Sequence, residues 1–194
     1  VCGKKAATSA LQDQLTGALI GLAHAAQGNE DKLTPETDKL ILEGLFVTVT
    51  NVNFNDESIS GLIERVHAEK NRLAPECSTC VHVCGRNADY DMNLLWNADE
   101  DVRSLKSLIL FGIRGMAAYA YHAAVLGYAS AEVNAFFYKA LRVVGEDYAM
   151  DGLLPVVMEV GAVNLKCMAL LDQANTETFG HPVPAEVPLT VEKG

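Results

Sequence analysis

The chain has 194 residues, of which 49 % are hydrophobic, so it is long enough to bury the core of one or two small domains. Its formal net charge of -10 at pH 7 argues against nucleic acid or an anionic membrane surface as a partner. The most apolar stretch is interrupted by Arg114 and His122 and has helical periodicity, which argues against a membrane span.

Three helices are predicted in the first half of the chain. Ser9 opens the first, residues 9–27, because it has capping-box spacing to a glutamine three residues later. Thr34, followed directly by a proline, opens the second, since proline is favoured at the first helical position. The third helix is predicted over residues 57–73, where apolar side chains recur on one face.

The second half of the chain repeats this plan. Asp99 or Asn97 can cap a long helix, and Ser130 can cap the next one. The last helix is predicted over residues 152–174, with Pro155 tolerated in its first turn. Six helices and no convincing strand predict an all-α fold.

The two halves of the chain also align with each other. The stretch that begins at Leu11 aligns without gaps on the stretch that begins at Leu105, and this pairs Gly21 with Gly115. Shared helical patterning alone could produce so short a match, but the economical interpretation is an internal duplication that gives two stacked three-helix bundles. The predicted boundaries are a three-helix unit over about 8–74, a connector over 75–98 and a second unit over about 99–174, which together make a helical domain of residues 1–174.

The composition changes after residue 174. Residues 175–194 contain three prolines and a series of alternating apolar residues, which indicates an extended linker that leads into a strand. A lone strand at the end of a helical domain has no sheet to join. We therefore expect the tail to be the start of a further domain that is missing from this chain.

A dense cluster of cysteines lies in the predicted connector. Cys77, Cys80 and Cys84 have C-x2-C-x3-C spacing, with His82 between them, which is compatible with a metal or redox site. No second C-x2-C pair follows, so a four-ligand site would need a donor from elsewhere, and free thiols or an adventitious disulfide fit the pattern equally well. An odd total of five cysteines does not resemble a secreted disulfide framework, so a reducing cytoplasm is the expected location.

The remaining two cysteines have different settings. Cys167 lies on an apolar helical stripe and is expected to be a buried small hydrophobe. Cys2 stands at the edge of the sequence, directly before the first helix. It is either incidental or the last member of a ligand set whose other members are absent.

Several long stretches of the sequence resemble a known family. They are V-C-G-K-K-A-A-T-S-A-L-Q-D-Q-L at the start, G-L-F-V-T-V-T-N-V-N-F-N, the helix N-A-D-E-D-V-R-S-L-K-S-L-I-L-F-G-I-R-G-M-A-A-Y-A, and M-A-L-L-D-Q-A-N-T-E-T-F-G-H-P-V-P near the end. Together they are similar to the N-terminal helical domain of the hybrid cluster protein family, whose members are also called prismane protein or hydroxylamine reductase. The resemblance runs over residues 1–194, and only the region around residues 77–96 departs from it.

This resemblance implies a function for the whole protein. Family members are oxidoreductases in which a helical domain of two three-helix bundles precedes two α/β domains that hold a hybrid iron-sulfur-oxygen cluster. Four cysteines near the N-terminus bind a 4Fe-4S cluster, and the last of them stands in a C-G-K context that matches Cys2. The family reduces hydroxylamine or related small nitrogen oxides, so the resemblance implies that this chain contributes scaffold and one cluster ligand and is inactive alone.

The resemblance also implies partners. These are the remaining domains of the same chain and an electron-donor protein, with a homo-oligomer as a further option; nucleic acid and membrane are not expected. The competing hypothesis is a helical metal-binding or interaction module that uses Cys77, Cys80 and Cys84 without redox catalysis.

Overall fold

The computed structural model describes residues 3–49, 52–74 and 88–186, and within these ranges it contains helices and no strand. The all-α prediction is therefore confirmed for the described part of the chain. In order, the elements are α1 (Ala6–Ala26), the short 3-10 helix η1 (Glu30–Lys32), α2 (Pro35–Val47), α3 (Asp56–Leu73), α4 (Met92–Trp96), α5 (Glu100–Val125), α6 (Ala131–Gly145) and α7 (Met150–Phe179).

Two of the predicted caps form, whereas Asp99 occupies the N-cap of α5 without a side-chain hydrogen bond. Thr34 accepts a hydrogen bond from the backbone N–H of Thr37, whose hydroxyl accepts one from the backbone N–H of Thr34, so α2 begins with a capping box. Ser130 caps α6 by accepting from the N–H of Val133. The predicted cap at Ser9 is wrong: α1 begins three residues earlier, and the Ser9 N–H bonds to the carbonyl of Lys5 as part of the first turn.

The last helix is longer than the sequence pattern predicts. α7 begins at Met150, so Pro155 lies in the second turn and not in the first, and it cannot donate to the carbonyl four residues earlier. The helix also continues past residue 174 to Phe179, so the first residues of the expected linker are helical. Gly180, with φ of +80°, follows the helix in a conformation that favours glycine.

The predicted connector contains a helix that the sequence did not reveal. α4 is five residues long, and Asp91 caps it by accepting from the N–H of Asn93. Such a short segment carries too little periodicity to be recognised as helical.

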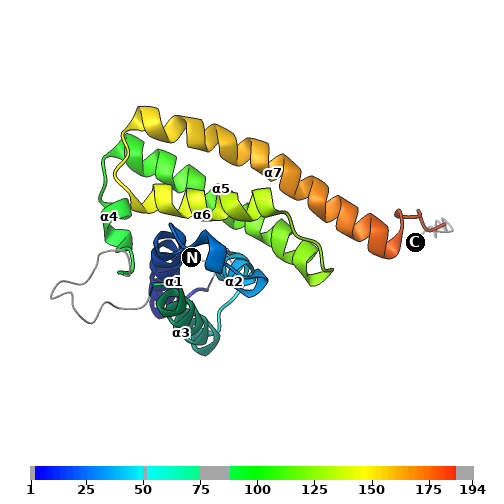
Figure 1. The fold of residues 1–194 in the computed structure, drawn as a ribbon, viewed down its shortest axis with the longest axis horizontal. Helices are drawn as coiled ribbons and strands as arrows, with labels where there is room; N and C mark the ends of the chain where they lie inside the picture. The colour runs from blue at the N-terminus through cyan, green and yellow to red at the C-terminus, as the bar shows by residue number, and fades with distance from the viewer. Residues whose placement is uncertain (1–2, 50–51, 75–87, 187–194) are drawn as a thin grey trace, which may run out of the picture.

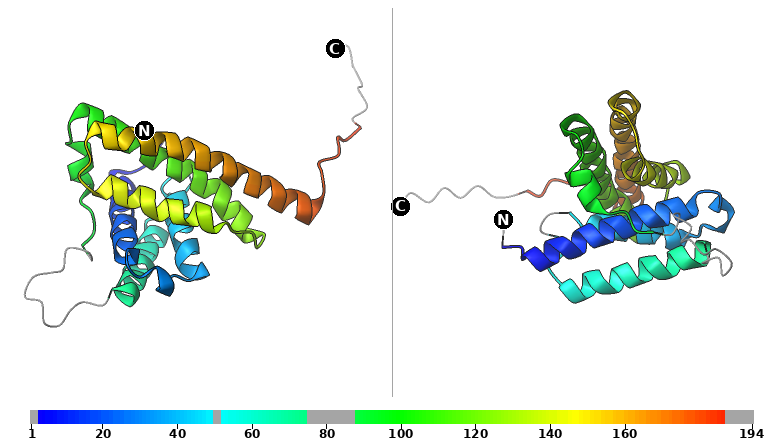
Figure 2. Two further views of the ribbon diagram at one scale, coloured as in Figure 1. Left: turned by 45° about the horizontal axis from the view of Figure 1, so that its top comes forward. Right: turned by 90° about the vertical axis from the view of Figure 1, so that its left-hand side faces the viewer.

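The helices form two groups of three that cross each other. In Figure 1, α1 is seen almost end-on beside α2 and α3, whereas α5, α6 and α7 run across the view. Within the first group α1 packs mainly on α3, and within the second α5 packs mainly on α7. The groups meet where α2 contacts α5 and α1 contacts α6, as the second view of Figure 2 also indicates.

α1 is the central element of the core. From Leu15 to Ala26 every residue except His24 is buried, which is typical of a helix that is covered on all sides. Glycines permit the closest contacts: a Cβ at Gly44 of α2 would meet the Leu19 side chain at 2.8 Å, and one at Gly145 would meet Ile20 at 2.5 Å. The core therefore continues from one helix group into the other.

Two helices differ from the rest in length and apolar character. In the described chain, α5 and α7 are long and apolar enough to cross a membrane by length and composition, with mean hydropathy of 1.3 and 1.6 over their most apolar windows. Core helices of water-soluble proteins have the same character. Only 28 % of the α7 window is buried, however, so one face of α7 is left uncovered by the described residues.

Candidate functional site

The four cysteines singled out from the sequence lie outside the described residues. Cys2 belongs to the start of the chain, and Cys77, Cys80 and Cys84 belong to residues 75–87, so their predicted roles stay predictions. Among the described residues no group of three or more histidine, cysteine, aspartate or glutamate side chains is arranged to hold a metal ion. The structure does show how the residues that flank these cysteines are fixed.

The residues that follow Cys2 are tied to one end of the first helix group. Gly3 has φ of +77°, a conformation that other residues rarely adopt, and space around it is open. The Lys4 ammonium donates to the Gln12 side-chain carbonyl at 2.6 Å. Gln12, itself buried, donates to the backbone carbonyls of Val47 and Asn53, both at 3.3 Å. The start of the chain is thereby connected to α1 and to the end of α2.

The residues that follow the cysteine cluster are anchored by side chains of α3. The Lys70 ammonium, which is almost fully buried, lies 2.5 Å from Oδ1 of Asp89, and Nε2 of His67 lies 2.8 Å from Oδ2. Burial raises the pKa of the Asp89 carboxyl, but the hydrogen bonds and charges of Lys70 and His67 outweigh burial and bring the pKa below its ordinary value. The carboxylate is therefore stabilised in its charged form.

The backbone of residues 88–90, which we call the 88–90 segment, also lies directly against α1. The Tyr90 N–H donates to the carbonyl of Gly17 at 3.1 Å. A Cβ at Gly17 would lie 2.2 Å from the Tyr90 carbonyl oxygen, and one at Gly21 would lie 2.8 Å from that of Ala88. Only glycine allows this approach, so α1 provides a groove for the 88–90 segment. The 88–90 segment is thus held on both α1 and α3.

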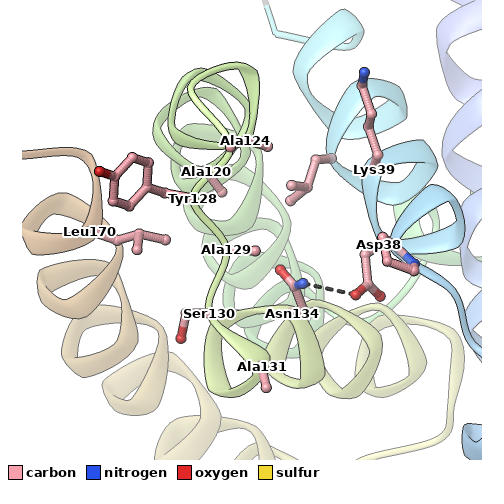
Figure 3. Close-up of a pocket in the computed structure, with 13 residues that line it drawn as sticks. Asp38, Lys39, Ala120, Ala124, Tyr128, Ala129, Ser130, Ala131, Asn134 and Leu170 are labelled. Atoms are coloured by element: carbon pink, nitrogen blue, oxygen red, sulfur yellow. Dashed lines mark hydrogen bonds between the residues drawn. The ribbon is translucent and has the colours of Figure 1, made fainter. Parts of the chain in front are cut away.

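A separate pocket lies where α2 meets α5 and α6, at the boundary between the two helix groups (Figure 3). Its volume is about 440 Å³, and alanines make up much of its wall. Figure 3 shows Lys39 extending away from Asp38, whose carboxylate accepts a hydrogen bond from Asn134 at 2.8 Å. The described residues that line the pocket include no cysteine and no histidine, and both oxygens of the Asp38 carboxylate already accept hydrogen bonds from side chains of α6.

Asp38 serves instead to join the two groups. Its other oxygen accepts from the hydroxyl of Tyr138, also at 2.8 Å, and Tyr138 is buried. Burial, together with the Asp38 charge, raises the pKa of the Tyr138 phenol far above its ordinary value, so the hydroxyl remains a donor at all ordinary pH values. The arrangement is a structural hydrogen-bond network between α2 and α6.

Cys167 is the one cysteine among the described residues, and it is a buried side chain as predicted. It is free, and its Sγ lies 3.4 Å from the carbonyl of Met116 on α5. Burial raises the pKa of the Cys167 thiol to about 11. A thiol of this kind is a poor nucleophile and a poor metal ligand at neutral pH.

We expect Cys167 to resist alkylation in the folded protein at pH 7. Because both the raised pKa and burial suppress the thiolate, its reaction with iodoacetamide should be about 100-fold slower than that of a free cysteine. Peptide mass spectrometry of the time course measures this, and the same residue in 6 M guanidinium serves as the fully reactive control. Rapid modification of Cys167 before unfolding would contradict the packing of α7 on α5.

Comparison with known proteins identifies the family. The model of the prismane/CO dehydrogenase family matches residues 1–194, the whole chain. This chain belongs to that family. The relatives of this prismane-family chain include proteins named hydroxylamine reductase from Maridesulfovibrio salexigens, 39% identical over 207 residues, and from Chlorobaculum tepidum, 43% identical over 195 residues.

The matched relatives are much longer than this chain. The alignment covers 100% of the chain but 39% of the Maridesulfovibrio salexigens protein, and 94% of the chain but 36% of the Chlorobaculum tepidum protein. A hydroxylamine reductase from Methanococcus vannielii is 38% identical over 212 residues, which cover 99% of the chain and 39% of that protein. This prismane-family chain therefore corresponds to the N-terminal part of its relatives, at about two fifths of their length.

Sequence reasoning recognised the family but missed the anchors of the 88–90 segment. Lys70 and Asp89 are separated by residues whose pattern predicts no particular fold, so nothing local indicates that they pair. One signal was present: Gly17 and Gly21 are four residues apart inside a helix, where each costs about 1 kcal/mol relative to alanine. Two such glycines on one face indicate a close approach of another backbone.

Proposed function

We propose that this chain is the N-terminal helical part of an iron-sulfur oxidoreductase of the hybrid cluster type, which reduces hydroxylamine or related small nitrogen oxides. The observation that carries the proposal is the similarity over the whole chain to proteins named hydroxylamine reductase. Reduction of hydroxylamine to ammonia and water consumes two electrons and two protons. The chain spans about two fifths of its relatives, and in this proposal the hybrid cluster and the residues that bind substrate belong to the remaining part of the protein.

Cys2 is the residue of this chain that we assign to the N-terminal iron-sulfur site. A 4Fe-4S cluster needs four thiolates and transfers electrons when bound, so Cys2 would act together with three cysteines located upstream. Lys4 and Lys5 follow closely in sequence, and positive charge nearby favours the thiolate that such a cluster requires. The contact from Lys4 to Gln12 supports a role of α1 in fixing this ligand relative to the bundle.

The helical body is the scaffold in this proposal, and we infer that it arose by duplication. Two features support this. The first and third helices are the main packing partners in each group, and the contact of α2 with α5 has its counterpart in the contact of α1 with α6. If the two groups are copies, α1 corresponds to α5 and α2 corresponds to α6. A twofold axis between the copies would then turn the contact of α2 with α5 into the contact of α6 with α1, as observed.

The other expected partners also belong to the proposal. An electron-donor protein in the cytoplasm would reduce the N-terminal cluster, and a homo-oligomer is compatible with it. A helical metal-binding or interaction module is the alternative, and it is favoured by the spacing of Cys77, Cys80 and Cys84.

The proposal is tested with a longer protein that begins upstream of Cys2 and continues through the following domains. We expect a brown protein with iron-sulfur absorbance that reduces hydroxylamine with a chemical reductant. The Cys2→Ser variant should lose the iron and the absorbance of the N-terminal cluster, because three thiolates hold such a cluster poorly. The 194-residue chain should show neither iron-sulfur absorbance from this site nor turnover.

Two controls separate the alternatives. Cys167→Ser removes a thiol that is buried in the helix pair and should leave iron content and turnover unchanged. Cys80→Ser should lower bound zinc or iron in the 194-residue chain only if the alternative holds. Full iron content and turnover in the Cys2→Ser variant would show that Cys2 is not a ligand of the N-terminal cluster.

A further inference from the structure

An uncovered apolar surface lies on α7, which carries more exposed large hydrophobic side chains than any other element of the described chain. Its side chains follow one another at alternating spacings of four and three residues, so they form a single stripe along the helix. Met158 and Leu165 are each 69% exposed. The members of the stripe are Leu154, Met158, Gly161, Leu165 and Met168.

The contacts of α7 show which way this stripe faces. Glu159 and Lys166 form ion pairs with Lys139 and Glu132 of α6, so this side of the helix is turned toward α6. A second side faces α5, where Cys167 contacts the Met116 carbonyl. The stripe occupies the third side, which no other described element contacts closely.

α5 continues the same surface. Leu108, Phe111 and Tyr119 are exposed on the side of α5 that is turned away from the core, at spacings that again place them on one face. α5 and α7 are packed along each other, with Gly112 so close to Val160 that a Cβ would lie 2.5 Å from it. The right-hand view of Figure 2 shows the two helices side by side above the first group. Together the exposed side chains form what we call the α5/α7 face.

A surface of this kind is costly to leave in water. Large contiguous apolar patches on soluble proteins usually mark a contact surface. The C-terminal part of α7 also runs past the ends of α5 and α6, as Figure 1 shows, and it ends at Phe179, which is 73% exposed. Helix that lacks tertiary packing is marginally stable in water, so this part needs a covering element.

We propose that the α5/α7 face is the surface on which the domain that follows this chain packs in the full-length protein. The proposal rests on the proposed function, since it takes the chain to be the N-terminal part of a longer hydroxylamine reductase. About three fifths of each relative lies outside the matched part, and the polypeptide that follows the match would continue from α7, the helix that carries half of the face.

The alternatives fit the face less well. A tethered domain acts at an effective concentration in the millimolar range, which gives it an advantage over a second copy of the chain. An anionic membrane would favour a border of lysine and arginine, but the net charge is -10, Lys166 is paired with Glu132, and Arg114 donates to Thr16. The face therefore suits a protein surface that is largely apolar.

Photochemical carbene labelling, read by peptide mass spectrometry, tests this on the 194-residue chain and on the full-length protein. We expect labelling of Met158 and Leu165 to be about fivefold lower in the full-length protein, because residues inside an interface are excluded from solvent. Leu94 of α4 is 62% exposed and lies off this face, so its labelling should be equal in both. Leu165→Glu should lower the Tm of the full-length protein only, whereas Leu94→Glu should lower neither.

The other outcomes overturn the proposal. Equal labelling of Leu165 in both proteins would show that the following domain leaves the face open. Protection that depends on protein concentration and accompanies a dimer mass would assign the face to a second copy, and protection of the 194-residue chain by phosphatidylcholine and phosphatidylglycerol vesicles would assign it to lipid. Iron content and hydroxylamine turnover of the same full-length sample test the proposed function separately from the packing of the α5/α7 face. A full-length protein that is active but labelled on this face would contradict the packing and leave the proposed function intact.

Discussion

Gly17→Ala is expected to lower the free energy of unfolding by about 2–3 kcal/mol, although alanine is the better helix former. The new Cβ would lie 2.2 Å from the carbonyl oxygen of Tyr90, and no real contact is this short. The obstacle is backbone, so no side-chain rotation relieves it. Either α1 or the 88–90 segment must shift, and the hydrogen bond from the Tyr90 N–H to the Gly17 carbonyl is then strained or lost.

Urea denaturation of the 194-residue chain measures the change in unfolding free energy. In a thermal denaturation experiment, Tm should fall by about 5–10 °C for a chain of this size. Gly61→Ala is the matched control, because Gly61 also lies inside a helix but a Cβ there meets nothing within 4 Å. It should stabilise by about 0.5–1 kcal/mol. If Gly17→Ala stabilised the chain as much as Gly61→Ala does, the close contact of the 88–90 segment with α1 would be wrong.

The parts of the fold that were predictable are those that neighbouring residues determine. The caps at Thr34 and Ser130 lie within four residues of their partners, and both formed as predicted. The start of α1 was misplaced because Lys5 occupies the N-cap without a side-chain hydrogen bond, so no cap residue marks it. The predicted end of α7 was too early because the polar residues that follow Ala174 resemble a loop in composition.

In the candidate site, too, the sequence predicted what depends on neighbouring residues and missed what depends on tertiary contacts. Cys2 was singled out through the context C-G-K, and the family membership that this context implied is confirmed. The anchors of the 88–90 segment depend instead on tertiary structure, since Lys70 and Asp89 meet only after the chain has left α3 and returned to α1. Periodicity places Lys70 on the apolar face of α3, four residues after Val66, but its residue type argues against burial, because lysine is rarely buried without a partner.

Lys70→Met is expected to destabilise the chain by about 2–3 kcal/mol at pH 7. Methionine fills the space of the buried lysine stem but leaves the Asp89 carboxylate without its closest cation, and removing one partner of a buried pair is strongly unfavourable. The figure is at the low end for such pairs because 38% of the Asp89 side chain is exposed, and solvent screens what remains. Hydrogen exchange at the Tyr90 amide should accelerate as well, since the 88–90 segment loses an anchor.

The pH dependence identifies the charge on Asp89 as the cause. The pKa of the Asp89 carboxyl is lowered in the folded state, so its contribution to stability is complete above its unfolded value near 4 and is lost as pH falls through the folded pKa. The difference in unfolding free energy between the parent chain and Asp89→Asn should therefore shrink as pH falls below about 4, where the Asp89 carboxylate of the parent chain becomes protonated. Lys139→Met, which breaks an exposed ion pair between α6 and α7, is the control and should cost less than about 1 kcal/mol. A Lys70→Met effect no larger than this would mean that the 88–90 segment is held on α1 by its glycine contacts and backbone hydrogen bond alone.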